Sequence, residues 1–171
     1  SGKELLEGVV AGYEVSIRAM EILVERASGG SQPLPATGQP YYSTGTGGAY
    51  GAAAAAAAKL LGCNEEQTIQ ALGIAAAHTP STRPMQIQTL GHMVKEGIGW
   101  AGITGVEAAF MAKHGFTGPD TIFDDGRAKG TSLDTLGASF EILSNYFKPY
   151  PACRWTHAAL DATLALMNEH H

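Results

Sequence analysis

The sequence GAAAAAAAKLLG, residues 51 to 62, decides the fold of this chain. Alanine has the highest intrinsic helix propensity, so seven consecutive alanines predict a helix, which we expect to run from about residue 48 to residue 61. Gly62 ends it, because glycine readily adopts the left-handed conformation found after a helix C-terminus. Small side chains let helix axes approach closely, and the alanines therefore predict a buried central helix.

Further helices are predicted on either side of this central one. Hydrophobic residues recur every three or four positions in the first 27 residues and form the apolar stripe of an amphipathic helix: Leu6, Val10, Tyr13, Ile17, Met20 and Val24. Asn64 and Gln67 have the spacing of a capping box that opens a helix. Segment 140–147 is compatible with either a strand or a helix. The remaining patterns place helices at about residues 3–27, 64–77, 99–114 and 155–169. The helix at 99–114 has Ile103, Val106 and Phe110 on one face. We therefore expect an all-α helical bundle forming a single domain over residues 1–171.

The composition is typical of a soluble globular protein. The chain has 171 residues, of which 44% are hydrophobic and 16% charged, enough to bury a core. Its formal net charge is −5 without any run of lysine or arginine, which argues against nucleic acid or an anionic membrane as a partner. Cys63 and Cys153 are too few for a disulfide scaffold and indicate a cytoplasmic location. No 18-residue apolar run occurs, so we expect no membrane span.

The loop before the central helix, YYSTGTGGAYG at residues 41–51, combines hydroxyl groups with free backbone amides. The unpaired N–H groups and the dipole of a helix start both attract anions. The G-x-G-x-x-G spacing of dinucleotide-binding proteins fails at Tyr50, and no Gly-Lys-Ser/Thr follows as in a P-loop. The alternative interpretation is helix capping and close helix contact, and the glycine pattern alone does not decide between the two.

A second glycine-rich stretch, GHMVKEGIGWAG at residues 91–102, precedes the helix predicted at 99–114 and contains Lys95. Most lysines lie on the protein surface, which is the simplest interpretation of this residue. The alternative is a cation directed at a carboxylate, or a proton donor if burial lowers the pKa of the amine.

The stretch KPYPACRWTH, residues 148–157, concentrates functional groups at the start of the last helix. Its two prolines restrict the backbone and favour an extended approach to that helix. The side chains gathered there are Lys148, Cys153, Arg154 and His157. In the alternative interpretation this is a rigid corner, with Tyr150 and Trp155 in the core and His157 a hydrogen-bonded core histidine.

No metal site is predicted from the residues. Neither cysteine has a C-x-x-C partner, no H-x-x-x-H pair occurs within a helix, and no acidic cluster accompanies the histidines. Cys153 and His157 have the spacing for a nucleophile and base on one helix face, but no other feature supports protease-type chemistry.

Four stretches together resemble the MmgE/PrpD family: STGTGGAYGAAAAAAAKLLG, ALGIAAAHTP, GWAGITGVEAAFMAKHGFTGP and KPYPACRWTHAALDATLAL. They occur in this order over nearly the whole chain. The family includes 2-methylcitrate dehydratase, cis-aconitate decarboxylase and iminodisuccinate epimerase. The resemblance implies an all-helical domain of a homodimer that works without metal or organic cofactor. The family's N-terminal segment and its α+β lid domain are missing, so we expect a fragment that is inactive alone.

The resemblance also implies a lyase, such as a dehydratase, that abstracts a proton next to a carboxylate of a small di- or tricarboxylate. Lys95 matches the lysine before the family's GxAA helix after a one-residue gap, Lys148 opens its KxxP motif, and His157 belongs to its TH pair. These three residues are the implied catalytic groups. The implied substrate-binding residues are Tyr42, Thr44, Thr46, Cys153 and Arg154.

The pattern departs from the family at Tyr42, where many members have histidine, and at Cys153, where some do. A phenol donates a hydrogen bond but is a poor general base near neutral pH. The alternative function is a truncated, catalytically inactive helical module for dimerisation or scaffolding. The two hypotheses differ in geometry, because the enzyme requires Lys95, Lys148 and Thr44 to converge on one pocket.

Overall fold

The computed structural model describes residues 1–29, 47–79, 97–119 and 132–170 of the chain. Its longer helices are α1 (Gly2–Gly29), α3 (Ala54–Leu61), α4 (Glu65–His78), α6 (Ile98–Lys113) and α7 (His157–His170). Its short helical segments are η1 (Gly48–Ala53), η2 (Ser132–Thr135), η3 (Glu141–Ser144) and η4 (Arg154–Thr156). Within the described ranges the chain forms no β-strand beyond one isolated bridge, which confirms the predicted all-α fold.

The predicted central helix is present, but its first turn differs from the expectation. Gly48–Ala53 is a π-helix, and the α-helix proper begins at Ala54. Gly62 follows the helix with a φ of +67°, the left-handed conformation expected of it. Asn64 and Gln67 then form the predicted capping box, each side chain accepting from the other's backbone N–H over 2.9 and 3.0 Å.

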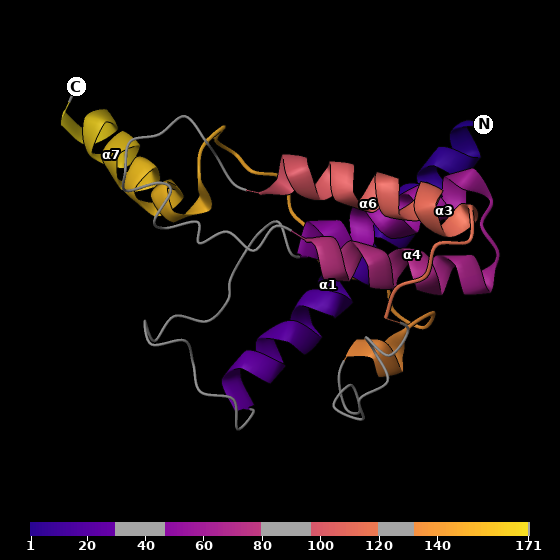
Figure 1. Cartoon of the computed structure of the whole chain (residues 1–171). Helices are drawn as coiled ribbons and strands as arrows, with labels where there is room; N and C mark the ends of the chain where they lie inside the picture. The colour runs from indigo at the N-terminus through magenta and orange to yellow at the C-terminus, as the bar shows by residue number, and fades with distance from the viewer. Residues whose placement is uncertain (30–46, 80–96, 120–131, 171) are drawn as a thin grey trace.

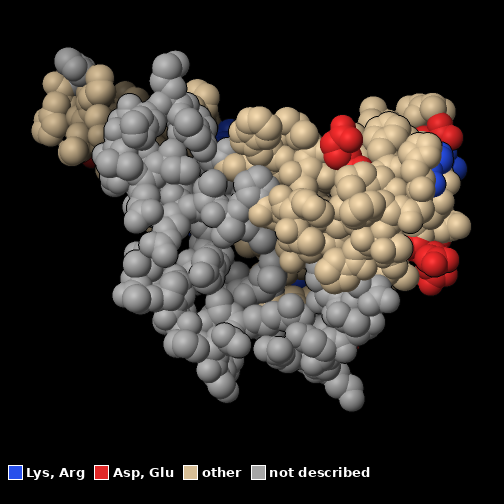
Figure 2. All heavy atoms as spheres, viewed as in Figure 1, with Lys and Arg blue, Asp and Glu red and all other residues tan. Residues whose placement is uncertain are grey.

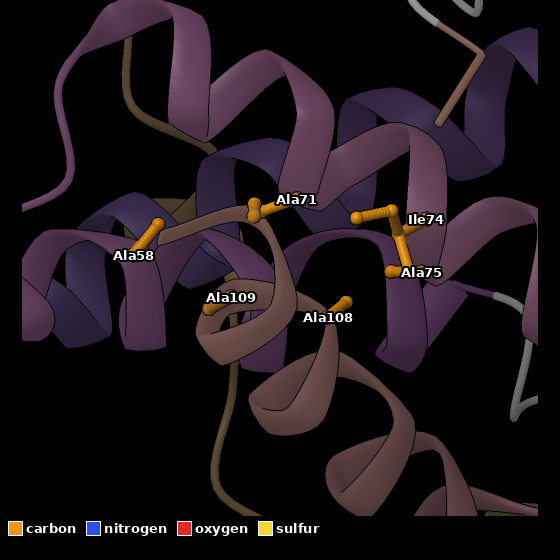
Figure 3. Packing of buried hydrophobic residues seen from close by; sticks show 7 residues of the cluster. Ala58, Ala71, Ile74, Ala75, Ala108 and Ala109 are labelled. Atoms are coloured by element: carbon orange, nitrogen blue, oxygen red, sulfur yellow. The ribbon is translucent and has the colours of Figure 1, made fainter. Parts of the chain in front are cut away.

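A core of small side chains joins α3, α4 and α6 (Figure 3). Its buried members are Ala58, Ala71, Ile74, Ala75, Ala108, Ala109 and Ala112. Figure 1 shows α3, α4 and α6 running side by side while α1 crosses them. Because alanine hardly projects from a helix, the three axes approach closely, as the alanine run predicted.

Helix α1 packs closely on η1 at a glycine. A Cβ placed on Gly51 would lie 1.9 Å from the backbone nitrogen of Ser16, so only glycine fits there. Such close contact leaves little room for large side chains, and Leu6 and Tyr13 of the predicted stripe are 67% and 42% exposed. The stripe therefore exists in the sequence but is only partly buried.

Helix α6 buries its small residues and exposes its large ones. The predicted face with Ile103, Val106 and Phe110 points to solvent, with exposed fractions between 40% and 54%. The opposite face contains Ala101, Gly105 and the three core alanines of this helix. The side of the molecule shown in Figure 2 has few charged side chains over α4 and α6.

Segment 140–147, undecided in the sequence, contains the 3₁₀ turn Glu141–Ser144 followed by extended backbone. The last helix begins two residues later than predicted, at His157, after the short turn η4. Figure 1 shows α7 apart from the other long helices, on the side of the bundle where α6 begins. None of its residues is buried, and its main contact among the described elements is η4.

Candidate functional site

One end of the bundle brings together the starts of two helices. A Cβ on Gly48 would lie 3.6 Å from the Cβ of Ala101, so η1 and the first turn of α6 are adjacent. Helix α4 is antiparallel to α6, since the side chain of Gln67 near its start donates to the carbonyl of Lys113 at the end of α6 over 3.3 Å. The C-terminus of α4 therefore lies at the same end as these two starts.

Both predicted substrate loops lead into this end. Tyr42, Thr44 and Thr46 precede η1 by at most six residues, and Lys95 precedes α6 by three. All four residues lie outside the described ranges, so their side chains are not placed. Their convergence with Lys148 remains a prediction, but the two loops end at neighbouring points.

The last part of the chain brings Lys148 and His157 together. The ammonium of Lys148 donates to the carbonyl oxygen of Ala152 over 3.3 Å, and Nε2 of His157 contacts the same oxygen at 3.2 Å. A carbonyl oxygen accepts hydrogen bonds and does not donate, so Nε2 must carry the hydrogen. The Nδ1 atom of a neutral His157 is then left with a lone pair that can accept a proton.

The family of this chain is shown by comparison with models of known protein families. The model of the MmgE/PrpD N-terminal domain matches residues 1–140 of the 171. This chain belongs to the MmgE/PrpD family. No curated protein matches it.

The MmgE/PrpD match includes the bundle from α1 to α6 together with η2. The cluster of Lys148 and His157 lies beyond residue 140, where the match ends. Its assignment to the family's site consequently rests on the motif KPYPACRWTH alone.

Tyr150 and Asp161 lie beside His157 on the helical side of the cluster. The Tyr150 hydroxyl donates to Oδ1 of Asp161, and this bond is the main cause that raises the pKa of the phenol above its ordinary value. The tyrosine ring meets the ring of His157 edge-on, with centroids 5.3 Å apart. Asp161 thus holds the tyrosine against one side of the histidine.

The interpretation of this corner as ordinary core is wrong in one respect. Trp155 is 93% exposed and does not belong to a core within the described structure. Arg154 and Cys153 are also exposed, and neither has a side-chain hydrogen bond among those described here. Both are accessible to a ligand, as the prediction for substrate-binding residues requires.

Three polar residues with described hydrogen bonds were not singled out from the sequence. Asp161 follows His157 by four positions, and that spacing on a helix would have placed the two on one face. His78 ends α4, with Nδ1 donating to the carbonyl of Ile74 over 2.9 Å. Gln70 of α4 accepts from the backbone of Gly118 over 2.7 Å and ties the chain after α6 to the bundle.

The described residues contain no group of three or more histidine, cysteine or acidic side chains arranged to hold a metal ion. In the same part of the chain, no helix is both long and apolar enough to cross a membrane. Segment 148–157 presents an ammonium, a guanidinium, an imidazole and a phenol, those of Lys148, Arg154, His157 and Tyr150.

Proposed function

We propose that the chain provides the helical part of a cytoplasmic MmgE/PrpD-type lyase and binds a small di- or tricarboxylate at the end of the bundle where η1 and α6 begin. The reaction would start with abstraction of a proton next to a carboxylate. The observation that carries this proposal is the meeting of Lys148 and His157 at one carbonyl oxygen, which places a cation beside a proton acceptor.

Each predicted residue has a role in this proposal. Lys148, Lys95 and Arg154 neutralise substrate carboxylates, which charge-assisted hydrogen bonds favour. His157 accepts or returns the proton at Nδ1. The remaining contacts to the substrate come from Tyr42, Thr44, Thr46 and Cys153.

The weak attachment of the Lys148 side chain supports its role in neutralising a substrate carboxylate. Its described hydrogen bond is to a backbone carbonyl, and the side chain is exposed. A substrate carboxylate can replace that neutral acceptor and forms a stronger bond, because both partners are then charged.

Binding is tested by titrating cis-aconitate into the chain in a calorimeter. The variant Lys148→Met should bind about tenfold more weakly, the effect of losing one charge-assisted hydrogen bond. Lys113→Met is the matched control, because Lys113 also donates to a backbone carbonyl, that of Leu61, at the opposite end of α6. Equal affinities for the two variants would refute the role given to Lys148.

Turnover is tested with 2-methylcitrate, cis-aconitate and iminodisuccinate, both on this chain and on a version extended at both ends by the flanking gene sequence. Activity that falls at least a hundredfold in His157→Gln supports the lyase, since general base catalysis contributes that much. No turnover of any of the three by the extended version contradicts it.

A second candidate function is favoured by the exposed apolar face of α6. Ile103, Val106 and Phe110 lie on one face of this helix and are 40% to 54% exposed. An apolar helix face of this kind suits contact with a second copy of the chain, as in a homodimer. In this alternative the helices serve assembly, and the chain neither binds nor converts a carboxylate.

A further inference from the structure

Two charged residues of α1 are buried, although neither belongs to the proposed substrate site. Arg18 is 1% exposed and Glu14 is 6% exposed. The Nε and Nη2 atoms of Arg18 donate to Oε2 of Glu14 over 3.2 and 3.0 Å. A buried ion pair is weak evidence for stability, because desolvation offsets most of the attraction. The question is therefore what else the pair holds.

The pair holds segment 132–145 against α1. Nη1 of Arg18 donates to Oγ1 of Thr135 over 3.0 Å, and Nη2 donates to the carbonyl of Ser139 over 2.9 Å. Oε1 of Glu14 accepts from the backbone N–H of Ile142 over 3.2 Å. One turn of α1 thus binds three points spread along this segment.

Hydrophobic burial holds the same segment only in part, since its most buried hydrophobic residues, Leu133 and Ile142, are half-buried. Leu136, Phe140 and Leu143 are 59%, 44% and 82% exposed. Most of their apolar surface remains in water, so they contribute only part of the free energy that full burial would give. The buried polar contacts with Glu14 and Arg18 are consequently a substantial part of the attachment of this segment.

This attachment limits how far the proposed catalytic cluster can move from the bundle. Six residues lead from Ile142 to Lys148, and an extended chain of that length spans at most about 20 Å. With segment 132–145 released, the next described hydrogen bond to the bundle is that of Gly118, thirty residues before Lys148. A chain of thirty residues reaches about 100 Å.

We propose that Glu14 and Arg18 are positioning residues that keep Lys148 and His157 within reach of the η1 and α6 end of the bundle. The inference rests on the proposed function, in which both parts contact one substrate. The effective concentration of one tethered part at the other falls roughly with the three-halves power of tether length. Lengthening the tether fivefold should therefore weaken binding about tenfold.

The test compares two double variants of the full chain. Glu14→Leu with Arg18→Met removes both buried charges together, so that neither is left without a partner. Lys3→Met with Glu7→Leu is the matched control, since these residues form an exposed pair at the same spacing on α1, with N–O distance 3.9 Å. Glu7 also lies 3.5 Å from the ammonium of Lys59, and exposed ion pairs of this kind contribute little to stability. Circular dichroism verifies that both remain helical.

Amide hydrogen exchange is the first measurement. The Ile142 amide, which donates to Glu14, should exchange at least tenfold faster in the Glu14/Arg18 variant than in the unmodified chain. In the control its exchange rate should not change. The amides of α4 should exchange as in the unmodified chain. Unchanged exchange at Ile142 would show that Glu14 and Arg18 do not hold segment 132–145, whatever the chain binds.

Calorimetry with cis-aconitate is the second measurement. The Glu14/Arg18 variant should bind about tenfold more weakly than the control, although Lys148 and His157 are intact. Faster exchange without any loss of affinity would overturn the positioning role. Failure of the unmodified chain to bind cis-aconitate would refute the proposed function and, with it, this positioning role. The exchange result would still decide separately whether Glu14 and Arg18 hold segment 132–145.

Arg18→Lys keeps the test valid if the double variant fails to fold. Lysine retains a positive charge beside Glu14 but lacks the planar fork that reaches Thr135 and Ser139 together. Exchange at Ile142 and the affinity for cis-aconitate should both lie between those of the unmodified chain and those expected for the double variant. Values equal to the unmodified chain would contradict the proposal.

Discussion

At the scale of single residues, Gly51 sets the distance between α1 and η1. A Cβ at this position would lie 1.9 Å from the backbone nitrogen and 2.3 Å from the Cα of Ser16. Backbone atoms cannot rotate away as a flexible side chain can, so the two helices would have to separate. We expect Gly51→Ala to lower the free energy of unfolding by about 3 kcal/mol in urea denaturation.

Gly102→Ala is the control for this prediction. Gly102 lies inside α6, and nothing lies within 4 Å of the position its Cβ would take. Alanine should raise the free energy of unfolding there by about 0.5 to 1 kcal/mol, because it favours the helix more than glycine does. Destabilisation of similar size at both positions would show that packing against Ser16 is not the cause.

The bond between Tyr150 and Asp161 should be visible in a pH titration. Accepting the phenolic hydrogen, Asp161 raises the pKa of Tyr150 above its ordinary value of 10.0. The stabilisation from this bond is therefore complete below pH 10 and disappears as the pH rises through the higher pKa of the folded chain. Asp161→Asn should move the titration of Tyr150 to lower pH, measured by absorbance at 295 nm.

Tyr150→Phe identifies which part of that absorbance change belongs to Tyr150. The titration of Tyr150 is the difference between the absorbance curves measured with and without its hydroxyl. If this difference has the same midpoint pH with Asp161 as with Asp161→Asn, the hydrogen bond does not affect the pKa of the phenol. The ring contact with His157 would then be the remaining described link between Tyr150 and the cluster.

Some residue roles could be predicted from the sequence and others could not. Gly62 and Asn64 act through their own backbone or through residues three positions away, and such local chemistry is visible in the sequence. Arg18 acts through Thr135 and Ser139, more than a hundred residues away, and no local pattern reports such contacts. Glu14 and Arg18 have the i, i+4 spacing at which ion pairs form on a helix, but that spacing does not report burial and the pair was not predicted.

At the scale of elements, the capping box of α4 offers a direct test. Asn64 accepts from the Gln67 amide over 2.9 Å, and the Gln67 side chain accepts in return. Asn64→Ala should lower the free energy of unfolding by about 1 kcal/mol. Asn64→Asp retains the acceptor and should lose much less, so equal losses in urea denaturation would contradict a capping role.

The long helices were predictable because hydrophobic spacing, alanine content and terminal glycines all indicate the same boundaries. Boundaries of the central helix and of α4 agree with the structure to within a residue. The π-helix of η1 was not predictable, since its wider turn accompanies the contact of Gly51 with α1 and not any propensity of GAYGAA. The buried face of α6 was equally unpredictable from the sequence, because close helix packing buries its small side chains and leaves its large ones exposed.

At the scale of the whole molecule, the exposed face of α6 predicts association. Val106 is 40% exposed in the middle of that face. If a second copy covers it, Val106→Glu would bury a charge in the interface and should weaken self-association at least tenfold in analytical ultracentrifugation. Ile69→Glu on α4 is the control, because Ile69 is also 40% exposed. Equal effects of the two variants would exclude this face as the interface.

The candidate site was predictable only as a set of segments. The loops with Thr44 and Lys95 were identified by glycine and hydroxyl content and by resemblance to the family, and the structure shows that the helices they lead into start side by side. The pairing of Lys148 with His157 depends on the backbone turn at Ala152, which no spacing rule specifies. Sequence patterns name such groups but do not report the path of the chain between them.

The alanine core has a consequence for how the molecule keeps one arrangement. An alanine side chain has no rotamers, so packing it requires no loss of side-chain conformational entropy, unlike leucine or methionine. Six of the seven residues that form the core of α3, α4 and α6 are alanine. Alanine side chains also cannot change rotamer to fill a gap. Any change in the packing of α3, α4 and α6 therefore requires a movement of whole helices. A hydrophobic interior of this kind should therefore be rigid, with the three helices held at one spacing and one register.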